Sequence, residues 1–419
     1  MGRPSRAAVT PLLLSLLASA TCEPVTLEVE GLARLRRTVI EDLLPARLPA
    51  CVSDDEVEEI DRRLWTSGLF DQVSVTRDGG RLKVAVREKW TLIPAIDLAT
   101  SRTLVDSFFF VSLIEGNFLG LGMEVGGYVM WSERSPSFEL WASETQTAAR
   151  RVTFEGGVSS VGSSIFFEDS EYTWNRRWWG GRFGARTPFW YGSQWRFGFG
   201  LDVSHERSTG EVAPGVRTEG VNVGTPVRAS WDAYEWHDVV PHGTRFSVEL
   251  TPTLFVTARD VTHRHGASMQ LLHAAKFGER TALFLNAVAE VAWWGDPNNA
   301  MLLGNVSQWR SYGAVGGVRG LPDNLYRTAA QAFGTVELRR AFAFTSTVFL
   351  QPVVFVDGGV LARVDVTGQP VAGLPALSGG AGLRLVWTTL AGLVPRLDGG
   401  VLLLPQRNWF VTFGLSQYF

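Results

Sequence analysis

The chain has 419 residues, of which 45% are hydrophobic, and it carries a formal net charge of −3. No internal segment runs for about 18 residues without a polar interruption, which disfavours a helical membrane protein. The small net charge indicates no general role in binding polyanions such as nucleic acid. The 44 glycines and 16 tryptophans are typical of many short strands with tight turns and interfacial aromatic residues.

Residues 1–20 have the pattern of a secretory signal peptide. Arg3 and Arg6 form a positive N-terminal region, and residues 12–18 form a short apolar core. Small residues ending at Ala20 provide a cleavage site, and the apolar core is too short to span a bilayer. The sequence therefore predicts export.

The two cysteines of the chain are Cys22 and Cys51. An even number of cysteines in an exported chain favours a disulfide, which here would pin the first part of the next module. Two unpaired thiols are the alternative. Cys22 also lies where a lipid could be attached, although Ser19-Ala20-Thr21 is a poor context for that modification.

Residues 24–90 have the pattern of a small α/β module. Alternating apolar residues predict a strand over 25–29, and helical spacing predicts a helix over 35–44. Ser53, followed by three acidic residues, is an N-cap that predicts a second helix, which Gly68 ends. Two alternating strands joined by an Asp-Gly-Gly turn follow. The order β-α-α-β-β describes a small sheet with helices on one face.

From residue 91 onward, helical signals nearly vanish and short segments alternate apolar with polar residues. The clearest row is Trp195, Phe197, Phe199, Leu201 and Val203, with small or charged residues between them. This pattern suits a strand with lipid on one side and water on the other. Further rows are Val125, Val129 and Trp131, and then Phe246, Val248, Leu250 and Leu254, which Pro252 interrupts.

Residues 91–419 therefore predict a transmembrane antiparallel β-barrel. At about 20 residues per strand with its turns, this length gives about 16 strands, and periodicity alone accepts about 14 to 18. A soluble sandwich would turn the apolar rows toward a core instead. The signal peptide and the tryptophan content favour the membrane.

The last strand alternates to the end of the chain. Its alternate positions are Trp409, Val411, Phe413, Leu415, Gln417 and Phe419, which are apolar or aromatic except for Gln417. A barrel in lipid closes by pairing its last strand with its first, because an open edge would leave backbone groups unpaired. Gly414 interrupts the row and permits a kink or weaker packing. It is either a flexible filler or part of a seam that opens.

In its order of motifs the chain resembles the Omp85 superfamily, of the bacterial surface antigen D15 type, which includes BamA-TamA-like proteins. Residues 24–90 resemble one POTRA domain, since Gly68, Phe70 and Val73 match the family pattern G-φ-F-x-x-V-x-V. Residues 116–122 resemble the N-x-x-G-x-G entry to an early barrel strand. The resemblance implies a 16-stranded barrel, a C-terminal assembly signal that ends in Phe419, and an outer-membrane location.

Two further segments resemble a pair of family motifs that meet inside the barrel. Val318-Arg319-Gly320 resembles the tip of the sixth extracellular loop, which in this family folds back into the lumen. Phe355-x-Asp357-x-Gly359 resembles its partner strand. Residues 382–384 and 396–398 resemble late-barrel signatures. The chain departs from the family in having Leu321 where an aromatic residue is usual, and in having one POTRA domain, so partner docking known for relatives does not carry over.

The chemistry of these segments predicts a buried ion pair. An arginine inside a barrel must be paired, because an unpaired buried charge costs several kcal/mol. The guanidinium of Arg319 can grip the carboxylate of Asp357 with two hydrogen bonds. Gly320 and Pro322 favour a tight turn that presents the charge. We expect Arg319, Gly320, Asp357 and Gly359 to form a loop–lumen lock; the alternative is a solvated Arg319 and an Asp357 that touches water.

Other candidate sites are weaker. His263 and His265 could bind a metal, but no cluster of other ligands supports this, so a polar loop is the preferred interpretation. Residues 174–179 mix tryptophan with arginine, which is more typical of an interfacial aromatic belt than of nucleic-acid binding. No glycine-rich phosphate loop or nucleophile elbow occurs, so we expect no enzyme, no metal and no cofactor.

The leading hypothesis is an Omp85-type outer-membrane protein that assists the insertion or translocation of polypeptides. Clients would add a strand to the POTRA sheet edge and to the barrel seam at Phe413, Gly414 and Leu415. The expected partners are outer-membrane lipid, unfolded or secreted polypeptides, and periplasmic accessory proteins. Alternatives are an exporter of one dedicated partner, a passive channel or structural surface antigen, and an outer-membrane hydrolase, which the absence of a Ser/His constellation opposes.

Overall fold

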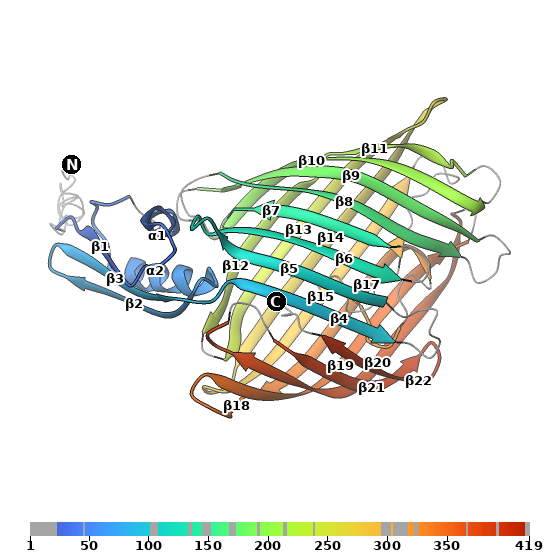
Figure 1. The fold of residues 1–419 in the computed structure, drawn as a ribbon. Helices are drawn as coiled ribbons and strands as arrows, with labels where there is room; N and C mark the ends of the chain where they lie inside the picture. Colours follow the sequence, from blue (N-terminus) through green and yellow to red (C-terminus); the bar gives the residue numbers. More distant parts are fainter. Residues whose placement is uncertain are drawn as a thin grey trace, which may run out of the picture.

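A computed structural model of the chain places a small α/β domain at one end of a closed β-barrel (Figure 1). It describes residues 23–44, 47–100, 108–132, 136–144, 152–166, 173–190, 193–212, 216–237, 239–294, 303–304, 317–321, 326–365, 368–390 and 394–414. The predicted signal peptide, Cys22, Leu415 and Phe419 lie outside these residues.

The N-terminal domain has the predicted element order β-α-α-β-β. Its elements are β1 (Thr26–Glu30), α1 (Arg37–Leu43), α2 (Asp54–Thr66), β2 (Phe70–Asp78) and β3 (Arg81–Glu88). The sheet order is β1-β3-β2, with β1 parallel and β2 antiparallel to the central β3. Both outer strands are therefore edges of the sheet.

Local sequence explains the ends of α2. Ser53 and Glu56 form a capping box: Ser53 Oγ accepts from the Glu56 amide, and the Glu56 carboxylate accepts from the Ser53 amide. Gly68, with φ +72°, turns the chain after the helix. Burial by itself would raise the pKa of the Glu59 carboxyl, but Arg62 and Arg63 hold that pKa below its usual value.

The barrel strands follow in chain order. They are β4 (Leu92–Thr100), β5 (Phe108–Phe118), β6 (Met123–Ser132), β7 (Ser137–Ser143), β8 (Thr153–Phe166), β9 (Thr173–Pro188), β10 (Trp195–Glu211), β11 (Glu219–Gly224), β12 (Val227–His237), β13 (Val240–Val256), β14 (Val261–Lys276), β15 (Thr281–Trp294), β16 (Leu303–Gly304), β17 (Arg327–Arg340), β18 (Phe342–Ala343), β19 (Val348–Val364), β20 (Pro370–Trp387), β21 (Arg396–Leu404) and β22 (Asn408–Gly414).

Among the described residues these segments make a wall of sixteen long strands. Segments β11 and β12 each pair with both β10 and β13, so they are two parts of one strand. The two-residue segments β16 and β18 each pair with a single long strand, β17 and β19 respectively. All neighbouring pairs are antiparallel, and β22 closes on β4. The predicted strand number is confirmed.

Proline determines where the β11/β12 strand is divided. The sequence predicted an interruption at Pro252, but β13 passes through it. The break falls instead in the neighbouring strand, between Gly224 and Val227, where the Thr225 amide donates to the Pro252 carbonyl. A second proline, Pro226, lies in the break itself, and its carbonyl accepts from the Gly200 amide of β10. Because neither proline has an N–H to donate, the ladder is incomplete on both sides of this point.

The apolar rows face outward, as predicted. The side chains of Trp195, Phe197, Phe199, Leu201 and Val203 are all exposed, whereas Arg196 between them is buried. Exposed apolar residues continue around the other strands, which gives the barrel an apolar exterior. In the described residues, no helix combines the length and the apolar character needed to cross a membrane.

The N-terminal domain touches the barrel at three places on one rim. The Arg36 amide donates to the Gly120 carbonyl in the β5–β6 turn, at 2.9 Å. Helix α2 lies against β12, across the mouth from that turn. The Trp90 amide donates to the Thr389 carbonyl in the β20–β21 turn, at 3.3 Å. These contacts hold the domain across the barrel end that carries the β5–β6 turn (Figure 1).

The β5–β6 turn carries the predicted N-x-x-G-x-G motif and explains its glycines. The Oδ1 of Asn117 accepts from the Gly122 amide at 3.1 Å, and Leu119, Gly120 and Gly122 all have positive φ. A Cβ added to Gly120 would lie 2.3 Å from the Arg34 carbonyl oxygen of the N-terminal domain. Glycine is needed here both for its conformation and for close approach of the two chains.

We predict that Gly120→Ala loosens the N-terminal domain from the barrel, because the new Cβ would overlap the Arg34 carbonyl oxygen. The measurement is hydrogen exchange at the amides of residues 33–36, which should lose protection. Gly278→Ala is a matched control, because Gly278 has a similar φ of +72° with nothing within 4 Å of its Cβ position. If residues 33–36 keep the same protection in Gly120→Ala as in Gly278→Ala, the contact at Gly120 does not hold the domain.

Candidate functional site

Residues 317–321, in the loop between β16 and β17, form a tip that lies inside the barrel. Val318, Arg319 and Leu321 are at most 1% exposed. The Leu321 amide donates to the Val318 carbonyl, and Gly320 takes a φ of +82°, which completes a tight turn. Val318 and Leu321 pack into an apolar cluster with Tyr326, Phe333, Leu361, Ala376 and Leu402. Leu321 therefore helps to anchor the tip in this cluster.

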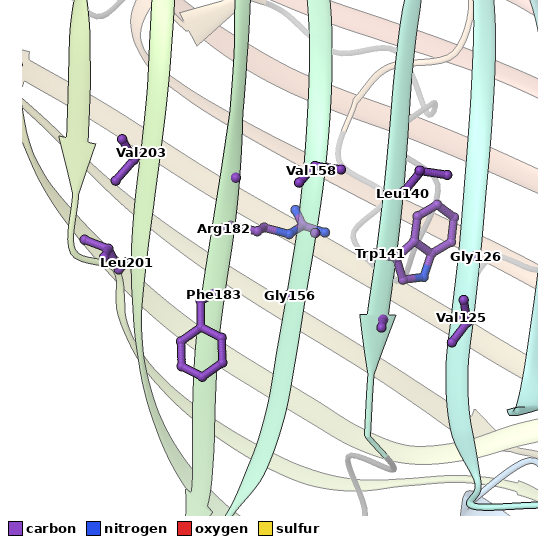
Figure 2. A pocket seen from close by; sticks show the side chains of 13 residues that line it. Val125, Gly126, Leu140, Trp141, Gly156, Val158, Arg182, Phe183, Leu201 and Val203 are labelled. Atoms are coloured by element: carbon purple, nitrogen blue, oxygen red, sulfur yellow. The ribbon is translucent and has the colours of Figure 1, made fainter. Parts of the chain in front are cut away.

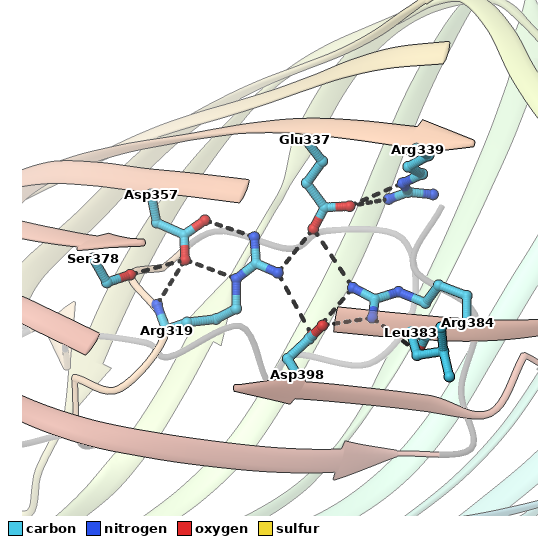
Figure 3. A network of polar contacts seen from close by, with 8 residues as sticks. All are labelled: Arg319, Glu337, Arg339, Asp357, Ser378, Leu383, Arg384 and Asp398. Carbon is cyan, nitrogen blue, oxygen red and sulfur yellow. Dashed lines mark hydrogen bonds and ion pairs between the residues drawn. The ribbon is translucent and has the colours of Figure 1, made fainter. Parts of the chain in front are cut away.

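The structure brings Arg319 and Asp357 together. The Nε of Arg319 donates to Asp357 Oδ2 and the Nη2 to Oδ1, each at 2.8 Å. The Arg319 amide donates to the same Oδ2 at 3.1 Å, as does the Ser378 hydroxyl. Asp357 is fully buried on the inner face of β19, while its neighbour Val356 is exposed on the outer face. The predicted contact thus consists of a two-pronged side-chain pair reinforced by a backbone hydrogen bond (Figure 3).

Four more buried charges extend this contact into a network (Figure 3). The Nη1 of Arg319 lies 2.9 Å from Glu337 Oε1 and 3.5 Å from Asp398 Oδ2. Glu337 also pairs with Arg339, at 2.8 Å. Arg384 pairs with Asp398 through two nitrogens, at 2.5 and 3.1 Å. The residues come from β17, β19, β20, β21 and the loop tip, so the network joins most of the C-terminal wall.

The network balances its own charge. Three arginines face three carboxylates, and all six side chains are at most 4% exposed. Removing two charges from water costs several kcal/mol per ion, which attraction offsets only when partners and geometry are complete. We infer that the balance of three cations and three anions is what allows the tip to stay inside the barrel.

Aromatic rings pack around the loop tip and its partner strand. The guanidinium carbon of Arg319 lies 3.2 Å from the centre of the Phe355 ring, which adds a cation–π contact. A Cβ on Gly320 would lie 2.3 Å from the Phe410 ring of β22, and a Cβ on Gly359 would lie 2.5 Å from Phe333. Both predicted glycines are therefore required because a ring occupies the space of a side chain. The tip contacts the last strand through Phe410.

Part of this network is predictable from the sequence, and part of it is not. Residues 382–384 and 396–398, singled out by resemblance, supply Arg384 and Asp398. Glu337 and Arg339 were missed. Their signal is two charged residues at alternate, inward positions of β17, beside the exposed Val336 and Leu338. That pattern alone does not show which strands bring partners to them.

The closing strands carry the predicted seam residues. Val411 to Gly414 pair with Thr100 to Asp97 of β4. Phe413 is exposed on the outer face. Gly414 pairs with Arg396 on one side and Asp97 on the other, so it continues the ladder on both sides. Leu415 and Phe419 lie outside the described residues.

The remaining candidates are placed as follows. Gly68 ends α2, Phe70 is fully buried in the domain core, and Val73 packs against that core. Cys51 is exposed just before α2, and because Cys22 is not described, the disulfide stays a prediction.

The interpretation of the histidine pair as part of a polar loop was wrong. His263 and His265 lie in β14, with their rings stacked 5.6 Å apart. The strand extends further toward its loop than the sequence pattern indicated. Within the described ranges, no group of three or more His, Cys, Asp or Glu side chains is placed to hold a metal.

Comparisons with known proteins agree with this fold. No family model matches the chain, and no curated protein matches it. Among solved structures, CdiB from Acinetobacter baumannii aligns with a TM-score of 0.61 at 11% identity, over 94% of this chain and 74% of that one. CdiB from Escherichia coli gives 0.53 at 12% identity, over 99% and 92%. BamA from Haemophilus ducreyi lacking POTRA domains 1–3 gives 0.51 at 12% identity, over 94% and 84%.

The fold and the comparisons together define the class. The protein is a closed antiparallel β-barrel with a short α/β domain at its entry. More particularly, its barrel shares the fold of the BamA and CdiB barrels with which it aligns.

We predict that Arg319→Ala and Asp357→Ala each lower the temperature at which the folded barrel loses its compact gel mobility. Each single change leaves an unbalanced buried charge, which costs about 3–5 kcal/mol in other proteins. The double variant restores neutrality with two cations and two anions, so it should be no worse than either single variant.

The control for this cycle is Arg217→Ala with Asp260→Ala, a half-exposed pair that joins two surface loops. Thr257, which donates to Asp260, and Arg217 hold the pKa of the Asp260 carboxyl below its usual value. Loss of the half-exposed Arg217–Asp260 ion pair should change the heat-dependent gel mobility of the barrel little. Additive effects of the two buried changes would contradict the pairing.

Proposed function

We propose that this is an outer-membrane protein that assists the insertion or translocation of polypeptides, with the N-terminal domain acting as a POTRA domain in the periplasm. The observation that carries the proposal is that the two edges of the barrel seam are attached to different bodies. Strand β4 continues directly from the N-terminal domain. Strand β22 instead packs against the loop tip, because the ring of Phe410 lies next to Gly320. The charge network holds that tip in place.

This arrangement supports a seam that can separate. The charge network ties the tip to β17, β19, β20 and β21, which makes the wall on the β22 side stiff. On the other side, Trp90 and Thr91 lead from the domain into β4. A movement of the domain would therefore act on β4 directly through the chain, and on the rest of the rim only through its contacts with the β5–β6 turn, β12 and Thr389. The Trp90–Thr389 hydrogen bond crosses between the two sides and would have to break first.

Backbone pairing explains how such a seam can act without a cofactor. Separated strands expose rows of N–H and C=O groups, to which an extended client can add as a new strand with little demand on its sequence. The edges β1 and β2 of the N-terminal sheet offer the same kind of pairing. A client could thus be handed from a sheet edge to the barrel seam.

Two features favour the seam over the lumen as the route for a client polypeptide. The loop tip and six buried charged side chains lie within the barrel. The N-terminal domain also contacts the rim at the β5–β6 turn and at β12, on different sides of the mouth. Passage of a chain through the lumen would require both the loop tip and the domain to clear the path, whereas pairing at the seam leaves the loop tip and its charge network in place.

The whole proposal is tested by depletion followed by quantitative proteomics of the outer membrane. Broad loss of barrel proteins is expected for a protein that assists insertion. Loss of one secreted protein would assign the chain as a dedicated exporter instead. An unchanged proteome would reject both and leave a passive channel or structural surface antigen.

The seam itself is tested by bridging it. With Cys22 and Cys51 replaced by serine, Ala99→Cys and Thr412→Cys introduce thiols at directly paired positions of β4 and β22. Oxidation or a short bifunctional thiol reagent should block client insertion, and reduction should restore it. The matched control is Ser230→Cys with Ser247→Cys, paired across β12 and β13. If the bridged seam supports full activity, the seam is not the route.

A further inference from the structure

The apolar exterior carries a groove on the wall formed by β6 to β10 (Figure 2). Its volume is about 610 Å³, and its rim includes Leu140, Val158, Phe183, Leu201 and Val203. These five side chains are all exposed on the outer face.

The floor of the groove is backbone. Gly156 and Gly181 occupy outward positions of β8 and β9, each between two exposed apolar residues of its strand, and neither has a side chain to fill the space. Gly181 is directly paired with Val203 of β10 and Val158 of β8. The groove is therefore a slot in the apolar surface, suited to a flexible hydrocarbon chain.

Beyond this groove, toward the barrel end away from the N-terminal domain, the outward side chains of β9 and β10 change from apolar to aromatic and then to basic. The next outward pair is Trp179 and His205, whose rings stack with centroids 4.3 Å apart. The Nε2 of His205 also lies 3.1 Å from Glu219 of β11. Aromatic rings of this kind mark the boundary between hydrocarbon and headgroups.

The outward pair beyond the rings consists of two arginines. Arg177 and Arg207 are directly opposite each other across β9 and β10, and both are exposed. The Nη2 of Arg177 donates to the Pro136 carbonyl, at 3.0 Å. Among the described residues, neither arginine forms an ion pair with a carboxylate; Glu219, which is opposite Arg207, lies instead against His205.

Two like charges directly across a strand pair destabilise a sheet unless an anion lies between them. A phosphomonoester carries up to two negative charges, and its oxygens match the planar fork of arginine. Four residues separate Gly181 from Arg177, a rise of about 13 Å along the strand. Because barrel strands tilt by about 35–45°, this rise is a depth of about 10 Å along the membrane normal. That depth is less than half of a hydrocarbon core about 30 Å thick, so the groove would lie in the same leaflet as the headgroups at the level of the arginines.

We propose that this column of β9 and β10 binds a phosphorylated membrane lipid. The phosphate of the lipid lies between Arg177 and Arg207. The glycerol or sugar part of the lipid lies against the Trp179 and His205 rings, and one acyl chain fills the groove over Gly156 and Gly181. The proposal rests on the proposed membrane location of the barrel. It concerns a wall remote from the β22–β4 seam, so it assigns a lipid contact that is separate from client handling.

The experiment is native mass spectrometry of the full chain in detergent with three probes: dilauroyl phosphatidic acid, dilauroyl phosphatidylcholine and inorganic phosphate. Phosphatidic acid should be retained at least about ten-fold more than phosphatidylcholine, and Arg177→Gln with Arg207→Gln should abolish that preference. Arg280→Gln with Arg340→Gln is the matched control. It removes two exposed arginines at the barrel end near the N-terminal domain and should leave retention unchanged.

The groove is tested separately by Gly181→Leu. A Cβ at this position meets nothing closer than 3.4 Å, so the side chain can be added without distorting the wall, and it should fill the slot. Retention of phosphatidic acid should fall, while folding, judged by gel mobility, stays intact.

Three results would overturn the proposal: equal retention of the two lipids, full retention by the Arg177 and Arg207 variant, or competition by inorganic phosphate at the same concentration as the lipid. The last would mean a free-anion site only. Because no client takes part in this measurement, its failure leaves the proteomic test of the proposed function untouched.

Discussion

The barrel depends on a balanced set of buried charges. Arg319 can occupy the interior only because Asp357, Glu337 and Asp398 surround it, and those carboxylates are in turn balanced by Arg339 and Arg384. Each member is so completely removed from water that it has no alternative partner in solvent. The interaction therefore specifies one position for the loop tip and does more to define the structure uniquely than to add stability.

Glycines make the same interaction geometrically feasible. The rings of Phe333, Phe355 and Phe410 lie over positions where a neighbouring residue has no side chain, as at Gly359, Gly380 and Gly400. These contacts let aromatic groups lie flat against the inner wall and leave room for the tip. Gly320 belongs to this set too, since its missing side chain lets the tip meet Phe410 of the last strand. Charge balance and close approach are thus two aspects of one constraint.

Much of this could be predicted from the sequence, because it depends on local patterns. The N-cap at Ser53, the outward row from Trp195 to Val203 and the two segments around Arg319 and Asp357 are each readable within a few residues. Other features depend on which strands become neighbours. The roles of Glu337 and Arg339 follow from register, which no single segment encodes. The histidine pair was misplaced because strands here run past the apolar band.

The position of the charge network along the chain has a consequence for the order of folding. Every partner of Arg319 comes from the C-terminal strands β17 to β21, so this part of the wall can capture the tip while the two ends of the barrel are still apart. Closure of β22 on β4 joins the most distant segments of the barrel and carries the largest loop-closure cost. The C-terminal wall with its captured tip can therefore act as the folding nucleus, with the seam as the last contact to form.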